Sequence, residues 1–125
     1  MKKATLTSVH PVLPVWDVSL AMAFYVDKLG FVLAFSDVPK APTYAGVRRD
    51  GVELHLQWHD PKEWEHTVDR PMLRFMVPQI EVLYHEYAAR DVFHSQTALR
   101  DTAWGTREFA FYDPFKNGLT FYRDL

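Results

Sequence analysis

The sequence contains no cysteine, which excludes disulfide bonds, thiolate nucleophiles and zinc sites built from thiolates. It also lacks an apolar run long enough to cross a membrane, and its first residues lack the apolar core of a signal peptide. Basic residues cluster only at Lys2-Lys3 and Arg48-Arg49, and the net charge is −2. Because phosphate neutralisation supplies most nucleic-acid affinity, we expect a cytoplasmic protein that binds neither nucleic acid nor a membrane.

Several catalytic motifs are missing as well. The sequence has no Ser-His-Asp order, no glycine-rich phosphate loop and no HExxH segment, so hydrolase and nucleotide-dependent chemistry have no support. It does have 15% aromatic residues, including four tryptophans, in a chain of 125 residues. That length is typical of one domain, and large rings suit either its core or a stacking surface for a ligand.

The chain contains two copies of one structural unit, 62 residues apart. In residues 15–31, a strand end leads into a helix with Phe24-Tyr25 and then to Leu29-Gly30-Phe31. In residues 77–93 the same order recurs, with Glu86-Tyr87 in the helix. The duplication indicates that the two halves share one topology.

Periodicity predicts that topology. Alternating residues favour strands, and apolar residues at helical spacing favour a helix after Asp17 and another near residues 80–88. We expect an α+β fold of tandem βαβββ modules, about 5–59 and 71–123, joined by the connector 60–70. The modules form a curved mixed sheet with helices on its outer face. The predicted strands are 5–15, 31–37, 43–49, 52–58, 72–77, a short strand near Phe93, 107–112 and 119–123.

These features resemble the vicinal oxygen chelate superfamily of glyoxalases, dioxygenases and antibiotic-resistance proteins. The motifs that carry the resemblance are Val15-Trp16-Asp17, Phe24-Tyr25, Leu29-Gly30-Phe31, Glu53-Leu54 and Asp113-Pro114-Phe115-Lys116-Asn117. Residues 11–14 and 104–109 resemble its bleomycin-resistance branch. The resemblance implies a homodimer that binds and sequesters a bleomycin-like antibiotic without transforming it. The sequence leaves open whether the first strand is exchanged between subunits.

Catalytic members of this superfamily hold a divalent metal with up to four ligands. The resemblance places those ligands at His10, Glu53, Met72 and Thr120. A thioether is a poor ligand for hard ions, and a threonine hydroxyl is weak beside a carboxylate. Because a catalytic metal usually has three protein ligands, we expect no metal cofactor and no catalytic residue.

An alternative stays open at this point. Glu53 and His55 lie on one strand face, so together with His10 they would satisfy a rule of two histidines and one carboxylate. Such a site would serve a glyoxalase-like or dioxygenase-like enzyme, a lyase or oxidoreductase that depends on Zn, Ni, Mn or Fe.

The predicted ligand is a small molecule that is aromatic and possibly cationic. Trp104 belongs to the ligand groove in the resemblance, although it equally fits a cap on the sheet end. Arg74 either favours an anionic ligand or pairs with Glu53 or Glu108. A third reading is an interaction module whose groove is filled by its own side chains. The predicted ligand-binding residues are Trp104, Trp58, Glu53, His55, His10, Arg74, Glu63 and Tyr122.

Overall fold

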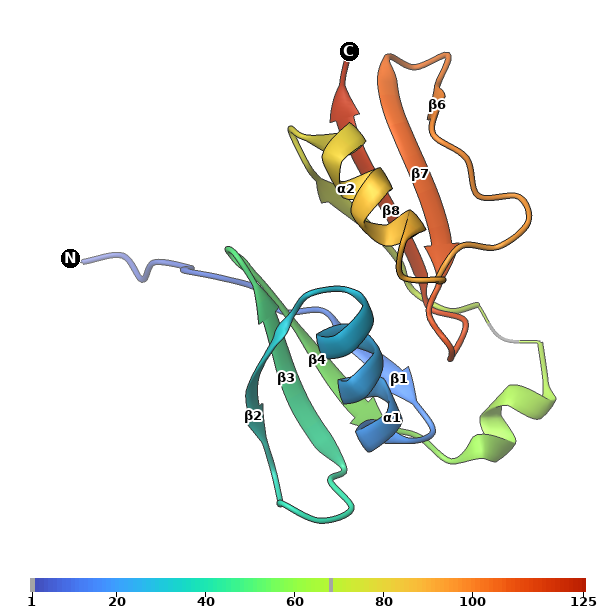
Figure 1. Cartoon of the computed structure of the whole chain (residues 1–125). Coiled ribbons are helices and arrows are strands. Elements are labelled where there is room, and N and C mark those ends of the chain that lie inside the picture. The colour runs from blue at the N-terminus through green and yellow to red at the C-terminus, as the bar shows by residue number, and fades with distance from the viewer. Residues whose placement is uncertain (1, 68) are drawn as a thin grey trace.

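The computed structural model describes residues 2–67 and 69–125. The chain forms two four-stranded mixed sheets, each with one helix across it (Figure 1). The strand order is β1-β4-β3-β2 in the first sheet and β5-β8-β7-β6 in the second. In each sheet the first strand of the repeat pairs parallel with the last, and the other pairs are antiparallel. The predicted α+β class is confirmed.

The elements follow the predicted order closely. The strands are β1 (Val12–Val15), β2 (Val32–Ser36), β3 (Tyr44–Arg49), β4 (Val52–Trp58), β5 (Met72–Met76), β6 (Arg100–Asp101), β7 (Thr106–Tyr112) and β8 (Gly118–Asp124). The helices are α1 (Val18–Ala23), continued by the π-helical turn η1 (Phe24–Lys28), the 3-10 helix η2 (Pro61–Glu65) and α2 (Ile80–Ala88).

Local sequence explains where α1 begins and where the helical segment ends. The Asp17 carboxylate accepts a hydrogen bond from the Leu20 N–H at 3.0 Å, which satisfies one of the free donors at the helix N-terminus. Gly30 follows η1 with φ of +78°, a conformation that glycine adopts without strain.

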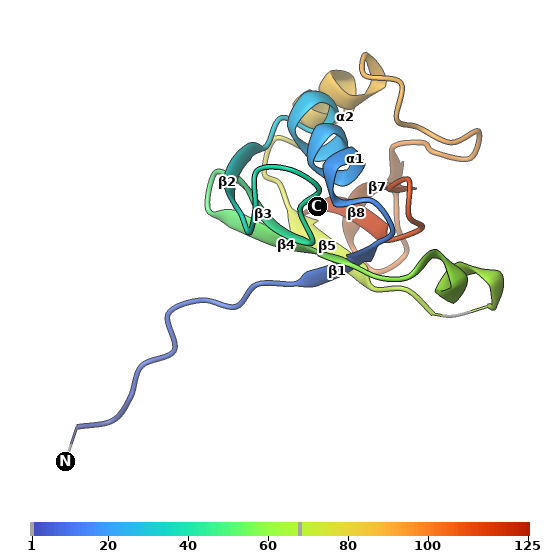
Figure 2. The ribbon, with the colours of Figure 1, turned by 90° about the horizontal axis from the view of Figure 1, so that it is seen from below.

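Both helices lie on one side of the molecule and cover one face of each sheet (Figure 2). The strand alternation decides which side chains face them. In β4, Leu54 and Leu56 are buried while Glu53 and His55 lie on the open face. In β5, Arg74 likewise lies on the open face. The residues packed between helices and sheets form one continuous core across both repeats.

Polar bonds also join the two repeats. The Tyr25 hydroxyl donates to Asp113 at 2.8 Å, and the Tyr87 hydroxyl donates to the Leu29 carbonyl at 2.8 Å. Asp113 accepts further bonds from the backbone and side chain of Asn117. Burial raises the pKa of Asp113 against the opposing effect of these bonds.

Two strand predictions are wrong. Residues 5–11 form no strand, because pairing with β4 begins only at Val12, and this segment extends away from the body (Figures 1 and 2). The chain at Phe93 is also irregular, and the Phe93 ring packs on Tyr84 of α2 with 5.1 Å between the ring centres. The second sheet ends instead in the two-residue strand β6. Within the described residues, no helix is both long and apolar enough to span a bilayer.

Candidate ligand-binding site

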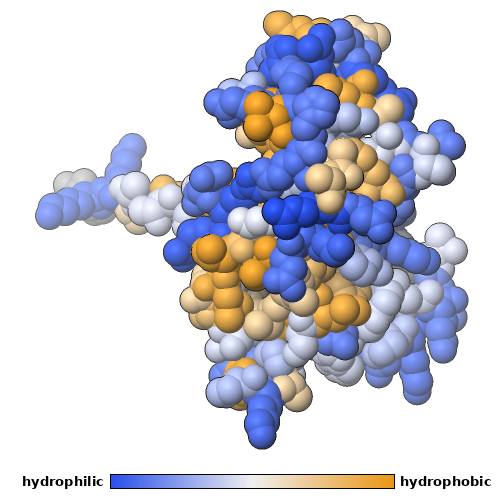
Figure 3. Space-filling view, viewed as in Figure 1, coloured by the Kyte–Doolittle hydropathy of each residue, from blue (hydrophilic) through white to orange (hydrophobic). Residues whose placement is uncertain are grey.

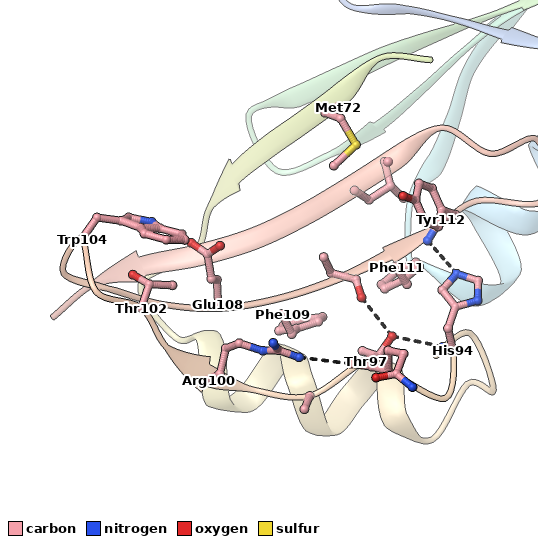
Figure 4. A pocket seen from close by; sticks show the side chains of 15 residues that line it. Met72, His94, Thr97, Arg100, Thr102, Trp104, Glu108, Phe109, Phe111 and Tyr112 are labelled. Carbon is pink, nitrogen blue, oxygen red and sulfur yellow. Dashed lines mark hydrogen bonds between the residues drawn. The ribbon is translucent and has the colours of Figure 1, made fainter. Parts of the chain in front are cut away.

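A pocket of about 490 Å³ lies over the second sheet, between β7 and the segment 94–104, which includes β6 (Figure 4). Its lining is mainly apolar, which suits an uncharged ring system. Trp104 and Glu108 lie near one end in the view, and His94 and Tyr112 lie at the other. The lining residues are Met72, His94, Gln96, Thr97, Ala98, Arg100, Thr102, Trp104, Glu108, Phe109, Ala110, Phe111, Tyr112, Gly118 and Leu119.

Trp104 sits in the turn before β7, and 69% of its surface is exposed. The turn is fixed below it, because the Thr106 N–H donates to the Thr102 hydroxyl at 3.1 Å and Gly105 adopts φ of +93°. A mostly exposed indole on a rigid turn offers a free face for stacking. It is not buried as a cap would be.

The Glu108 carboxylate in the pocket lining is already paired with a residue outside that lining. Arg74 donates to Glu108 at 3.1 Å, and its guanidinium lies 4.4 Å from the centre of the Tyr122 ring. Burial alone would raise the pKa of Glu108, but bonds from Thr106 and Arg74 outweigh it and lower that pKa. Arg74 therefore pairs with Glu108, one of its two predicted partners, and is not free for an anionic ligand.

Sequence reasoning missed the residues that hold the outer wall of this pocket. The His94 ring accepts a bond from the Tyr112 N–H at 2.8 Å, and the Thr97 hydroxyl donates to the Ala110 carbonyl at 2.9 Å. These side chains occupy the edge of β7 that a neighbouring strand would otherwise use. The available signal was the lack of periodicity between Phe93 and Gly105, which predicts a loop but not its contacts.

The structure brings His10, Glu53 and His55 together on the open face of the first sheet. Glu53 Oε2 lies 2.8 Å from His55 Nε2 and 3.7 Å from His10 Nε2. Hydrogen bonds from His55 and then Arg48 lower the pKa of Glu53 to about 2, so this carboxylate is ionised at neutral pH.

Two of the predicted ligand-binding residues, Trp58 and Glu63, lie apart from both the pocket and the group of His10, Glu53 and His55. Trp58 ends β4 with 46% of its surface exposed, and Glu63 lies in η2, where its carboxylate bonds to His59 at 2.9 Å. Neither lines the pocket beside Trp104, and Arg74 and Tyr122 also lie outside its lining.

The four metal positions implied by the resemblance do not suit a metal as a set. Met72 Sδ lies over Gly118 on the second sheet, and Thr120 is buried on β8. Their thioether and neutral hydroxyl are poor donors for hard divalent ions. We therefore assign no metal-dependent reaction to this set of four residues.

Comparison with known proteins decides the family. The sequence model of the glyoxalase superfamily matches residues 2–124. The chain belongs to the glyoxalase superfamily. The fold agrees with solved structures that superpose on nearly the whole chain.

Relatives within the glyoxalase superfamily match the chain over nearly its whole length. A bleomycin resistance protein of Geobacillus stearothermophilus is 29% identical over 129 residues, which cover 92% of this chain and 95% of the relative. The bleomycin-binding protein of bleomycin-producing Streptomyces verticillus, solved with copper(II)-bleomycin, is 27% identical and superposes with a TM-score of 0.74, covering 95% and 97%. The bleomycin resistance determinant of transposon Tn5 shares the fold, with 18% identity, a TM-score of 0.79 and coverage of 95% and 98%.

Proposed function

We propose that this chain binds a bleomycin-like antibiotic in the cytoplasm and sequesters it by stoichiometric, non-catalytic binding. The observation that carries the proposal is the exposed Trp104 beside an apolar pocket of about 490 Å³. Relatives that match over nearly the whole chain are bleomycin resistance and bleomycin-binding proteins. A metal-dependent enzyme on the family's four positions has less support, because Met72 and Thr120 replace two ligands.

The pocket favours an aromatic ligand with a cationic group. Trp104 at the pocket end supplies a flat face for a heteroaromatic ring, and the Tyr112 ring lies toward the opposite end (Figure 4). Glu108 supplies an ionised carboxylate in the lining, and a ligand cation would share it with Arg74. Stacking therefore provides most of the affinity, and the carboxylate provides orientation.

A homodimer is part of the same proposal. The N-terminal segment exposes Leu6 to 98% and Val9 to 88%, and the edge strand β2 exposes Val32 to 61%. Apolar side chains also gather on the surface of the first repeat (Figure 3). A second copy across a two-fold axis would cover these groups. Light scattering after size exclusion tests the dimer, and a monomeric mass at micromolar concentration would contradict it.

Binding is tested by titrating the purified chain with bleomycin while its tryptophan fluorescence is recorded. We expect saturable quenching, and at least a tenfold weaker affinity, about 1.4 kcal/mol, for Trp104→Ala. Trp58→Phe is the matched control, since Trp58 is also exposed but lies outside the pocket. An unchanged affinity in Trp104→Ala, or no binding by the unaltered chain, would overturn the proposal.

A further inference from the structure

Three metal-binding side chains meet on the open face of the first sheet. His10 and His55 each offer an imidazole nitrogen, and Glu53 offers a carboxylate oxygen. These three atoms all lie within 4.8 Å of one another. The backbone keeps them together, because the His55 N–H donates to the carbonyl of Pro11 at 2.9 Å, directly after His10.

Neighbouring side chains orient the same atoms. Arg48 donates twice to Glu53 Oε1, at 2.7 and 3.1 Å, which leaves Oε2 facing the two histidines. The Tyr44 hydroxyl lies 2.7 Å from His55 Nδ1, so when an ion replaces the Nε2–H that bonds to Glu53, it can accept from an Nδ1–H and leave the Nε2 lone pair for that ion. Ligating histidines in metal sites are commonly fixed by such a bond from their second nitrogen.

The geometry points to a divalent transition-metal site made by His10, Glu53 and His55 within the first repeat alone. It differs from the four-residue set of the superfamily, because it takes its third donor from β4 and needs neither Met72 nor Thr120. It also stands apart from the antibiotic proposal, since its donors lie in the first repeat and Trp104 lies in the second. Two imidazoles and one carboxylate favour Zn²⁺, Ni²⁺, Co²⁺ or Cu²⁺ over Mg²⁺ and Ca²⁺.

Metal binding requires His10 to rotate, because its ring is stacked on that of His55 with 4.8 Å between the ring centres. Ligands about 2.0–2.1 Å from a tetrahedral ion stand roughly 3.3 Å from one another. The pair formed by His55 and Glu53 is already slightly closer than this, at 2.8 Å, and His10 is somewhat farther from Glu53, at 3.7 Å. The His10 side chain precedes β1 and is 35% exposed, so its ring has room to rotate toward an ion. Three protein donors leave a coordination position open for water or a ligand atom.

The test is a titration of the full chain, free of any affinity tag and stripped with chelator, with Co²⁺ and then Zn²⁺. We expect one ion per chain, with a Co²⁺ d–d absorption band typical of nitrogen and oxygen ligands that Zn²⁺ abolishes. His55→Ala and Glu53→Gln should each weaken binding about 100-fold or more. Tyr44→Phe, which removes only the orienting bond, should weaken it about tenfold.

His59→Ala is the matched control, because His59 forms a similar pair with Glu63 at 2.9 Å but belongs to no group of three potential metal ligands among the described residues. It should bind Co²⁺ as the unaltered chain does, and circular dichroism should show that every variant is folded. Failure of the unaltered chain to bind either ion, or equal losses in His59→Ala and His55→Ala, would overturn the inference. Neither result bears on bleomycin binding, which is measured separately without added metal.

Discussion

Tyr25 and Tyr87 occupy equivalent positions in the two repeats, and each sends its hydroxyl into the other repeat. Tyr25 donates to the buried carboxylate of Asp113, and Tyr87 donates to the carbonyl of Leu29. Both rings are almost completely buried. The two repeats are therefore joined by a reciprocal pair of hydrogen bonds, from Tyr25 to Asp113 and from Tyr87 to Leu29, which we call the reciprocal joint.

Removing one of these hydroxyls should weaken the whole fold. Tyr25→Phe leaves Asp113 buried with one donor fewer, so we expect a loss of about 1–3 kcal/mol in the free energy of unfolding. Urea denaturation followed by circular dichroism measures it. Tyr84→Phe is the control, because no hydrogen bond of the Tyr84 hydroxyl is found among the described residues. Equal losses in both variants would mean that the bond contributes nothing.

The ion pair between Arg49 and Glu86 should make stability depend on pH. Arg49 donates to both carboxylate oxygens of Glu86, at 2.8 and 3.0 Å, and these bonds lower the pKa of Glu86. A lowered carboxyl pKa stabilises the folded state above the unfolded value of about 4.3 and loses that effect as pH falls below it. Glu86→Gln should cost about 1 kcal/mol at pH 7 and much less at pH 3, measured by urea denaturation. A cost that is the same at both pH values would contradict this.

The depth of the pocket should depend on Gly118. A Cβ at this position would clash with Met72 Sδ, which lies directly over it. Gly118→Ala should therefore push the Met72 side chain into the pocket and weaken bleomycin binding roughly tenfold, about 1.4 kcal/mol. Fluorescence titration measures the change. The double variant Gly118→Ala with Met72→Ala should restore affinity, and a lack of restoration would place the effect elsewhere.

The outer wall of the pocket should loosen when His94 is replaced. His94→Ala removes the acceptor for the Tyr112 N–H, and losing such an exposed hydrogen bond costs about 0.5–1.5 kcal/mol. Hydrogen exchange should become faster over residues 94–104 while the amides of β8 stay protected. Exchange that rises equally in both regions would indicate general destabilisation and not a local opening.

The sequence predicted the sheets better than the loops. Alternation in residues 52–58 gave the bounds of β4 and placed Glu53 and His55 on its open face, where both lie. The contact of that face with His10 depends on the chain path before β1, and residue spacing alone left it open. The pocket wall was missed because His94 and Thr97 act through single bonds to β7, and such bonds have no period in the sequence.

The reciprocal joint has a consequence for how such a protein diversifies. The groups that bind the repeats together lie beneath the helices, while the histidine cluster and the pocket occupy separate outward surfaces. Substitutions on either surface can alter ligand recognition without changing the hydrogen bonds that join the two repeats. One repeat can therefore gain or lose a binding specificity while the structure of the other repeat stays the same.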